Sequence, residues 1–292
     1  MNIPNIETIA GITYSKPEVI LLQQTGIGTS ELAARTCYDS FDNSENEEVK
    51  YINDIIDKEP KEELLNTSLQ ALNNIKHSDL LNDLAWTYFH HSILEHANLS
   101  YLIRGTSRGV LQEHARHRIQ AISVRSTRYT MSSVLNAYVA SLPIYDKDSR
   151  FKFFFQKIDV DSLFVTRGHY NTFEIQSILS KLDFQRKQIG DEEFFKLAIA
   201  KSSLKYLTET DPDVLFEMLQ NGKAKRNVGD NFKHLVTDNW KVDMVVTFNL
   251  RSLKNYFQLR DSGAAYFQIK WLAQAMKEVT PSKYLNLIIK EK

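Results

Sequence analysis

The block from Val242 to Arg260 constrains the fold most, because two periodicities meet within it. Residues 242–248 are apolar and largely β-branched, which predicts a strand. Directly after this strand, Leu250, Leu253 and Phe257 recur at the spacing of one helix face. The chain therefore joins at least one strand directly to an amphipathic helix.

An earlier strand is predicted from Pro17 to Gln24, and Gly26 and Gly28 then turn the chain into a helix capped near Thr29. A dinucleotide-binding fingerprint is one interpretation of these glycines. The third glycine position holds Glu31, however, and an acid at a helix N-terminus would repel a pyrophosphate. A plain strand–turn–helix is favoured.

A third strand is predicted from Asn98 to Arg104, followed by a helix through His117. Residues 42–76 are rich in Asn, Glu and Lys and indicate a charged surface insertion with a helix after Pro60. Residues 146–230 are mostly helical in pattern, with Phe-rich stripes expected in the core. A further helix, expected to end at Asn221-Gly222, lies in this region. We expect one compact domain over residues 1–292.

An arginine-rich segment runs from Glu113 to Ser133, and we expect it to begin at the end of a helix and continue as a loop. Its cationic and hydroxyl side chains are Arg116, Arg118, Arg125 and Arg128, with His114 and His117, and Ser123, Ser126, Thr127, Tyr129 and Thr130. Guanidinium groups bind phosphate oxygens through paired, charge-assisted bonds. A solvated basic face, a nucleotide pocket and a nucleic-acid groove all remain open.

The composition limits these alternatives. The 292 residues include 36 basic and 36 acidic side chains, so no global field attracts nucleic acid or an anionic membrane. The chain has neither an apolar N-terminal leader nor a run long enough to cross a bilayer, which predicts a soluble, cytoplasmic protein without membrane partners. The single cysteine, Cys37, excludes an intrachain disulfide.

Three histidines and an acid gather within seven residues, at His90, His91, Glu95 and His96. The spacing matches neither the His-Glu-x-x-His of metalloproteases nor the Glu-x-x-His of di-iron bundles. Histidines that grip the backbone or a ligand are favoured, and no metal is expected. A metal-dependent hydrolase is kept as a further hypothesis.

Three ordered motifs resemble those of the flavin-dependent thymidylate synthases. Arg116-His117-Arg118, then seven residues, then Ser126, resembles the family signature. The run from His90 to His96 is similar to the His-x-Ser-x-Leu-Glu-His element. The run from Thr247 to Arg260 is similar to the Thr-x-Asn-x-Arg-Ser-Leu-x-Asn-(x)4-Arg helix, and Ala33 to Tyr38 fits the first helix.

The resemblance implies methylation of dUMP to dTMP, with methylenetetrahydrofolate as carbon donor, FAD as hydride relay and NADPH as reductant. It implies a mixed α/β (α+β) fold, with a central, largely antiparallel sheet flanked by helices, and a homotetramer whose sites lie between subunits. The residues it places at FAD are His90, Ser92, Arg116, His117, Arg118, Asn249, Arg251 and Asn255. The residues it places at dUMP are Glu113, Arg116, Arg125, Ser126, Arg128, Lys233 and Arg260.

The resemblance also implies that Arg260 is the catalytic residue, which would stabilise an N3-deprotonated or polarised uracil. A permanently charged guanidinium suits that role. Ser126 is expected to be a ligand hydroxyl rather than a nucleophile. Cys37 is expected to be buried inside the first helix rather than to serve as a nucleophile.

Some positions depart from the commoner family pattern. Glu113 stands where Gln is frequent, Lys233 where Arg is frequent, and Ala264 where a flavin-contacting His is frequent. The rival hypothesis from another class is a nucleic-acid-binding protein that uses the 116–128 arginine cluster.

Overall fold

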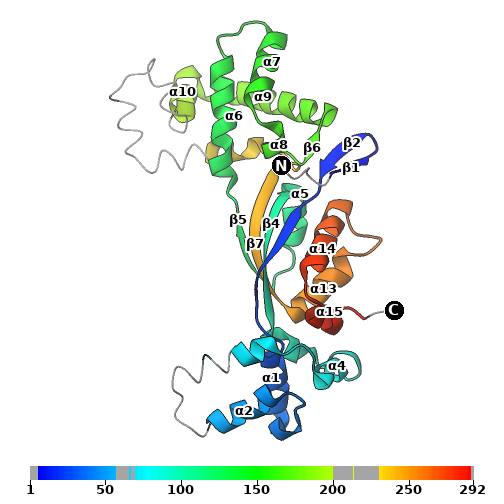
Figure 1. The fold of residues 1–292 in the computed structure, drawn as a ribbon. Coiled ribbons are helices and arrows are strands. Elements are labelled where there is room, and N and C mark those ends of the chain that lie inside the picture. Colours follow the sequence, from blue (N-terminus) through cyan, green and yellow to red (C-terminus); the bar gives the residue numbers. More distant parts are fainter. Residues whose placement is uncertain (1–5, 57–65, 67–69, 200–212, 214–229, 291–292) are drawn as a thin grey trace. The chain divides into compact units, whose positions relative to one another are not determined.

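The computed structural model describes residues 6–56, 66, 70–199, 213 and 230–290. Figure 1 shows a mixed α/β fold, which confirms the predicted fold class. The strands among the described residues are β1 (Ile6–Ile9), β2 (Ile12–Ser15), β3 (Glu18–Gln24), β4 (Asn98–Ser107), β5 (Ala121–Val124), β6 (Thr166–Arg167) and β7 (Lys241–Asn249).

The described helices are named as in Figure 1. The α-helices are α1 (Gly28–Tyr38), α2 (Glu47–Ile56), α4 (Asp79–Trp86), α5 (Arg108–His114), α6 (Thr127–Ser141), α7 (Lys147–Lys157), α8 (Val160–Leu163), α9 (His169–Ile189), α10 (Asp191–Ile199), α13 (Leu250–Arg260), α14 (Phe267–Val279) and α15 (Ser282–Ile288). The 3-10 helices are η1 (Phe41–Asn43), η2 (His91–His96) and η4 (Lys233–Leu235).

The chain divides into two compact units. The first, called here the helical unit, comprises residues 1–16, 105–111 and 124–242, and the second, called the pocket unit, comprises residues 17–104, 112–123 and 243–292. The chain passes between them several times. The expectation of one domain over residues 1–292 stays a prediction.

The strands form two sheets, ordered β1-β2-β6 and β3-β4-β7-β5. β1 pairs with β2, β2 with β6 and β3 with β4, each antiparallel. Val242, Met244, Val246 and Phe248 alternate as buried residues along β7, as expected for a strand with one face in the core. The strands predicted near residues 17–24, 98–104 and 242–248 are confirmed.

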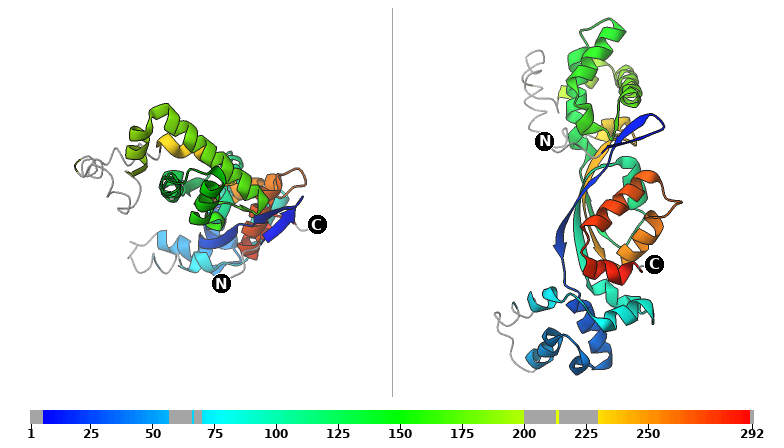
Figure 2. Two further views of the ribbon diagram at one scale, coloured as in Figure 1. Left: turned by 90° about the horizontal axis from the view of Figure 1, so that it is seen from above. Right: turned by 45° about the vertical axis from the view of Figure 1, so that its right-hand side comes forward.

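The core of the pocket unit lies between the sheet and three helices. α14 packs on β3, and Figure 2 shows α13, α14 and α15 together beside the strands. Polar contacts tie the helices to the strands, since the Tyr101 hydroxyl lies 2.8 Å from Thr280 Oγ1 and the Tyr284 hydroxyl donates to Thr25 O at 2.6 Å. The predicted helices after residue 250 and around residues 269–276 are confirmed.

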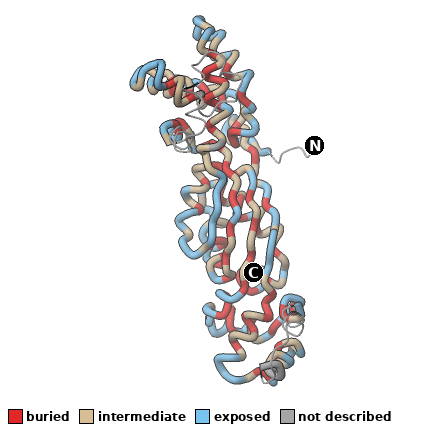
Figure 3. The backbone as a smooth tube through the Cα atoms, turned by 90° about the vertical axis from the view of Figure 1, so that its left-hand side faces the viewer, coloured by how far each residue is buried: buried red, intermediate tan, exposed pale blue. Residues whose placement is uncertain are grey.

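The helical unit has its own aromatic core. Phe154, Phe194, Phe232 and Trp240 are buried in it, contributed by helices and by the segment before β7. Figure 3 shows how buried and exposed stretches alternate along the chain. The Phe-rich stripes are therefore core residues, as predicted, within the part of residues 146–230 that the structure describes. The helix expected to end at Asn221-Gly222, and the helix expected after Pro60, lie outside the described residues.

The first glycine-rich turn differs from expectation at its cap. α1 begins at Gly28, with Ile27 as the N-cap residue and no side-chain cap, so the predicted cap near Thr29 is wrong. A Cβ on Gly26 would lie 2.3 Å from Asn73 Cα, and one on Gly28 would lie 2.7 Å from Leu72 O. These glycines allow close backbone packing against residues 72–73, which explains them without a bound phosphate.

Glu31, in the first turn of α1, is completely buried. Its carboxylate accepts hydrogen bonds from Ser44 Oγ at 2.6 Å and from Asn46 Nδ2 at 2.8 Å, and lies 3.6 Å from Arg35 Nε. This acid therefore attaches the segment after η1 to α1, a structural role.

Cys37 is exposed, so the prediction of a buried role is wrong. The buried face of α1 includes Ser30, Glu31 and Ala34, and the helix ends at Tyr38. Cys37 lies in the last turn, off this face and beyond the packed part of the helix.

The arginine-rich segment is also more ordered than the predicted loop. α5 ends at His114, β5 joins the edge of the four-stranded sheet, and α6 starts at Thr127 after Ser126 as its N-cap residue. Pairing with β7 explains the strand, because an edge strand gains its backbone hydrogen bonds from a neighbour distant in sequence. Ile119, Ile122 and Val124, which lie between the arginines, are exposed.

Candidate functional site

A pocket of about 1110 Å³ opens in the pocket unit. Its walls come from η2, from the connection between α5 and β5, from α13 and from the segment after α13. The lining residues are His91, Glu95, Arg116, His117, Arg118, Ile119, Asn249, Arg251, Ser252, Lys254, Asn255, Gln258, Leu259, Arg260, Ser262, Ala264 and Ala265. The volume is at the upper end for small-molecule sites, which suits a large ligand.

α13 supplies the longest wall. The Asn249 side chain accepts a hydrogen bond from Ser252 N at 2.8 Å and so caps the helix. Leu250, Leu253 and Phe257 are buried, whereas Arg251 and Asn255 are exposed and line the pocket. The prediction that Arg251 and Asn255 share one face is confirmed.

Arg260 is held by three hydrogen bonds at the end of α13. Its Nε donates to His117 Nε2 at 2.8 Å, its Nη1 donates to Glu113 Oε2 at 2.6 Å, and its Nη2 donates to Glu113 O at 3.2 Å. Because an arginine cannot accept, His117 accepts at Nε2 and is neutral, with its proton on Nδ1. Burial, followed by the positive charge of Arg260, lowers the pKa of His117, and the charge of Glu113 opposes this.

His114 lies behind this network rather than in the pocket. The residue is fully buried, and its Nδ1 lies 3.1 Å from the Tyr256 hydroxyl. Its Nε2 has no hydrogen-bond partner among the described residues. Burial is the main cause that lowers the pKa of His114 to about 4, and the positive charge of Arg260 acts in the same direction. The expectation that His114 would face an anion is therefore wrong, because the last turn of α5 directs it into the core.

The connection after α5 presents Arg116 and Arg118 to the pocket. Turn hydrogen bonds from Arg116 N to Glu113 O and from His117 N to His114 O, at 3.4 and 3.1 Å, shape this connection. Arg116 and Arg118 are both exposed, and in the described part of the chain no carboxylate lies within 4.0 Å of either guanidinium group. They give the pocket a net attraction for anions.

Six of the eight residues predicted for FAD line this pocket, namely Arg116, His117, Arg118, Asn249, Arg251 and Asn255. His90 and Ser92 are exposed and do not line it, whereas His91 does. Arg251 forms an ion pair with Glu95 across the opening. Ala264 lines the wall at the position where the family frequently has a histidine.

The residues predicted for dUMP are divided between the units. Glu113, Arg116 and Arg260 belong to the pocket unit, whereas Arg125, Ser126, Arg128 and Lys233 belong to the helical unit and do not line this pocket. Arg128 lies 3.5 Å from Asp230, measured from Nε to Oδ1, and Lys233 starts η4.

Lys254 and Gln258 line the pocket although sequence reasoning did not select them. A polar residue inside an amphipathic helix is usually solvated, so no local pattern distinguishes these two. Their role depends on the elements that the helix faces.

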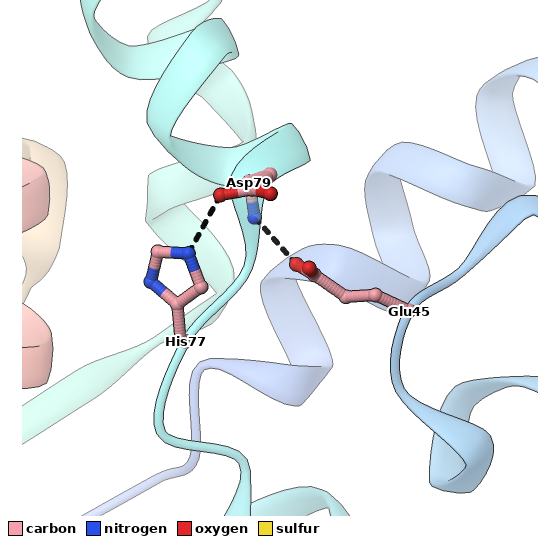
Figure 4. A group of neighbouring side chains, drawn as sticks. All are labelled: Glu45, His77 and Asp79. Atoms are coloured by element: carbon pink, nitrogen blue, oxygen red, sulfur yellow. Dashed lines mark hydrogen bonds and ion pairs between the residues drawn. The ribbon is translucent and has the colours of Figure 1, made fainter.

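The described residues of the histidine cluster from His90 to His96 do not bring three potential metal-ligand atoms within 4.8 Å of one another. Among the described residues, only Glu45, His77 and Asp79 bring three such ligand atoms within 4.8 Å of one another. His77 Nε2 lies 2.6 Å from Asp79 Oδ1, and Glu45 Oε1 accepts a hydrogen bond from Asp79 N at 2.6 Å. Figure 4 marks both contacts with dashed lines. All three residues are exposed. Their hydrogen bonds at the start of α4 explain why the three side chains lie close together.

Fold and pocket together define an α/β protein with a large cationic site suited to a nucleotide-like anion. The family model described as thymidylate synthase complementing protein matches residues 20–283, and the chain belongs to this family. The resemblance predicted from the three motifs is confirmed.

Relatives and solved structures agree with this assignment. The chain is 25% identical to the flavin-dependent thymidylate synthase of Campylobacter jejuni over 267 residues, which cover 91% of this chain and 93% of the relative. It is 25% identical to that of Wolinella succinogenes over 276 residues, covering 92% and 96%. The crystal structure of thymidylate synthase X from Helicobacter pylori with FAD and dUMP aligns with a TM-score of 0.55 and 21% identity, covering 94% of this chain and 97% of the other.

None of the helices in the described part of the chain is both long and apolar enough to cross a membrane.

Proposed function

We propose that this protein is a flavin-dependent thymidylate synthase, which methylates dUMP to dTMP with methylenetetrahydrofolate as carbon donor and NADPH as reductant. The observation that carries this proposal is the convergence of Arg116, His117 and Arg118 with α13 around one large pocket. Family membership and the names of the matched relatives support it. Because its substrates are soluble nucleotides, we expect the enzyme to act in the cytoplasm.

FAD fits the pocket by size and charge. A dinucleotide needs a large site with cations for its diphosphate, and the 1110 Å³ pocket has two arginines without a carboxylate partner among the described residues. Asn249, Arg251 and Asn255 would hold it from α13, and Arg116, His117 and Arg118 from the α5–β5 connection. His90 and Ser92 stay in the proposal as residues of the neighbouring segment. Bound FAD would supply the hydride relay.

Arg260 would meet the uracil ring. Negative charge that develops on the ring is stabilised best by a donor already fixed in place. The contacts from Arg260 to Glu113 and His117 provide that fixation, because they hold the guanidinium from two sides. Glu113 also offsets the charge of Arg260 at rest, whereas the Gln frequent in the family would not.

The phosphate of dUMP would be bound by Arg116, Arg125, Ser126 and Arg128, with Lys233 in the same role. The Ser126 hydroxyl has no hydrogen bond among the described residues, so no base activates it there, and a ligand hydroxyl is the simpler role.

A homotetramer with sites between subunits would allow residues of both units to contribute. Light scattering at micromolar concentration should give four chains, and an active monomer would contradict this.

The test is a sequence of three measurements on the purified chain. First, binding to the protein should quench the fluorescence of FAD. Second, NADPH should bleach the bound flavin under anaerobic conditions. Third, addition of dUMP and methylenetetrahydrofolate should yield dTMP. Arg118→Ala should weaken FAD binding, whereas Arg186→Ala, which removes an ion pair with Asp191 outside the pocket, should not. Failure to bind FAD would refute the proposal. Salt-dependent binding of random oligonucleotides without flavin uptake would favour the nucleic-acid hypothesis instead.

A further inference from the structure

Lys254 is a buried lysine in the wall of the pocket. Only 6% of its surface is exposed, although lysine normally keeps its ammonium group in water. Burial lowers the pKa of Lys254. A buried cation destabilises the fold unless a partner compensates its charge, so this residue requires an explanation.

The protein compensates the ammonium group only in part. Nζ lies 3.8 Å from the centroid of the Trp86 ring, which is held by a 2.8 Å hydrogen bond from its Nε1 to Asn286 O. Such a cation–π contact is stabilising but modest. Nζ also lies 3.1 Å from His91 Nε2, and that same nitrogen lies 3.2 Å from Ala85 O. One ring nitrogen cannot donate to the carbonyl and accept from the lysine at once.

The other cations of α13 are compensated differently. Arg251 is paired with Glu95 and Arg260 with Glu113. In the part of the chain that the structure describes, Lys254 Nζ has no carboxylate within 4.0 Å and a single nitrogen acceptor for its three N–H bonds. The remaining donors are available to an anion that enters the pocket.

We propose that Lys254 is a phosphate-binding residue, whose ammonium group donates to a phosphate oxygen of a nucleotide ligand in the pocket. The identity of that ligand rests on the proposed function, and the diphosphate of FAD is its expected source. Lys254 precedes Arg260 by six residues, which is about 9 Å along the helix axis. The ribityl chain of FAD likewise separates its reactive ring from its diphosphate, so the two ends can be bound by different parts of α13.

The test compares ligands that differ in phosphate content. Dissociation constants of FAD, riboflavin, dUMP and NADPH are measured for the wild type, Lys254→Met and Lys254→Arg. Lys254→Met should raise the FAD constant ten-fold or more and change the riboflavin constant less than two-fold, and Lys254→Arg should recover part of the loss. The matched control is Lys277→Met, because Lys277 also lies over an aromatic ring, that of Phe257 at 5.5 Å, but pairs with Asp261 and does not line the pocket. It should leave the FAD constant within two-fold.

The outcomes separate this proposal from the proposed function. An equal effect on FAD and riboflavin, or unchanged constants for every phosphate ligand, would overturn it. A selective effect on dUMP or NADPH would support phosphate binding and assign another source. If the wild type binds no FAD, the proposed function fails. Calorimetry then measures the binding of inorganic pyrophosphate, which tests phosphate binding by Lys254 separately. Loss of pyrophosphate binding in a Lys254→Met protein with a normal melting temperature supports the proposal, and unchanged binding, or none in the wild type, overturns it.

Discussion

The two units of the chain present their predicted ligand residues in different ways. In the pocket unit, six residues expected at FAD line one pocket, and Arg260 is fixed there by Glu113 and His117. In the helical unit, Arg125, Ser126 and Arg128 lie at the start of α6, with Arg128 about two-fifths exposed beside Asp230. A pocket is thus assembled within the pocket unit alone, whereas Arg125, Ser126 and Arg128 lie in the helical unit and do not line it.

The largest effect on activity is expected at Arg260, which Glu113 and His117 hold in place in the pocket unit. Arg260→Ala should lower the rate of dTMP formation by about 10²–10³-fold, because it removes a fixed donor to the developing charge on uracil. FAD binding should change little, since Arg260 is assigned to the substrate. Turnover and flavin content measured on the same sample check this. A variant with wild-type turnover would remove Arg260 from catalysis.

Low pH should destabilise the pocket unit more than the helical unit, because His114 is buried in the pocket unit. Its folded pKa of about 4 lies below the unfolded value near 6.5, so the unfolded state binds a proton first as pH falls. This contribution to stability is complete above pH 6.5 and is lost between 6.5 and 4, by as much as about 3 kcal/mol. The described core of the helical unit contains no histidine. Hydrogen exchange should therefore show protection falling first in the pocket unit.

The control for the acid prediction is a double variant, His114→Phe with Tyr256→Phe, which removes both partners of one buried hydrogen bond. Its stability should depend less on pH over the same range. An unchanged pH profile would mean that other groups cause the acid sensitivity.

A pair of substitutions tests whether the two units serve different ligands. Arg128→Ala should raise the dUMP dissociation constant ten-fold or more, since a charge-assisted bond contributes about 1.5–3 kcal/mol, and should leave FAD binding unchanged. Arg118→Ala should do the reverse. Both constants are measured by titration on each variant. If both variants weaken both ligands equally, the distinction between the units fails.

The smallest effect is expected at Cys37. The side chain is exposed at the end of α1, so Cys37→Ser should change the free energy of unfolding by less than about 0.5 kcal/mol. Activity should persist as well, because a hydride relay through flavin requires no thiolate nucleophile. Loss of dTMP formation with normal FAD content would show that the proposed mechanism is wrong.

Local periodicity was sufficient for the elements that build the pocket. The alternation along β7 and the apolar stripe of α13 identified both elements, and four of the eight lining residues between Asn249 and Arg260 were selected from the sequence. These features depend on near neighbours in the sequence, which is why the pattern carries them.

Features that depend on distant partners were missed. β5 is a strand because it joins β7, and its own four residues are all exposed and carry no alternation. Lys254 is buried because Trp86, from α4, covers it. Cys37 is exposed because α1 ends one residue later, and α6 begins directly after Ser126, where a loop was expected. Each depends on tertiary contacts or an element boundary, which are the least predictable from local composition.

The three contacts of Arg260 have a consequence for selectivity among solutes. Its guanidinium already donates to a carboxylate, a carbonyl and an imidazole of the same chain. Two of its five N–H donors remain, one on Nη1 and one on Nη2. A small inorganic anion such as chloride would meet these donors beside the carboxylate of Glu113, so it should gain little there. A flat heterocycle that offers acceptors at fixed spacing can instead join or replace the set in register. At Arg260 itself, the protein should therefore prefer such a heterocycle to a small inorganic anion.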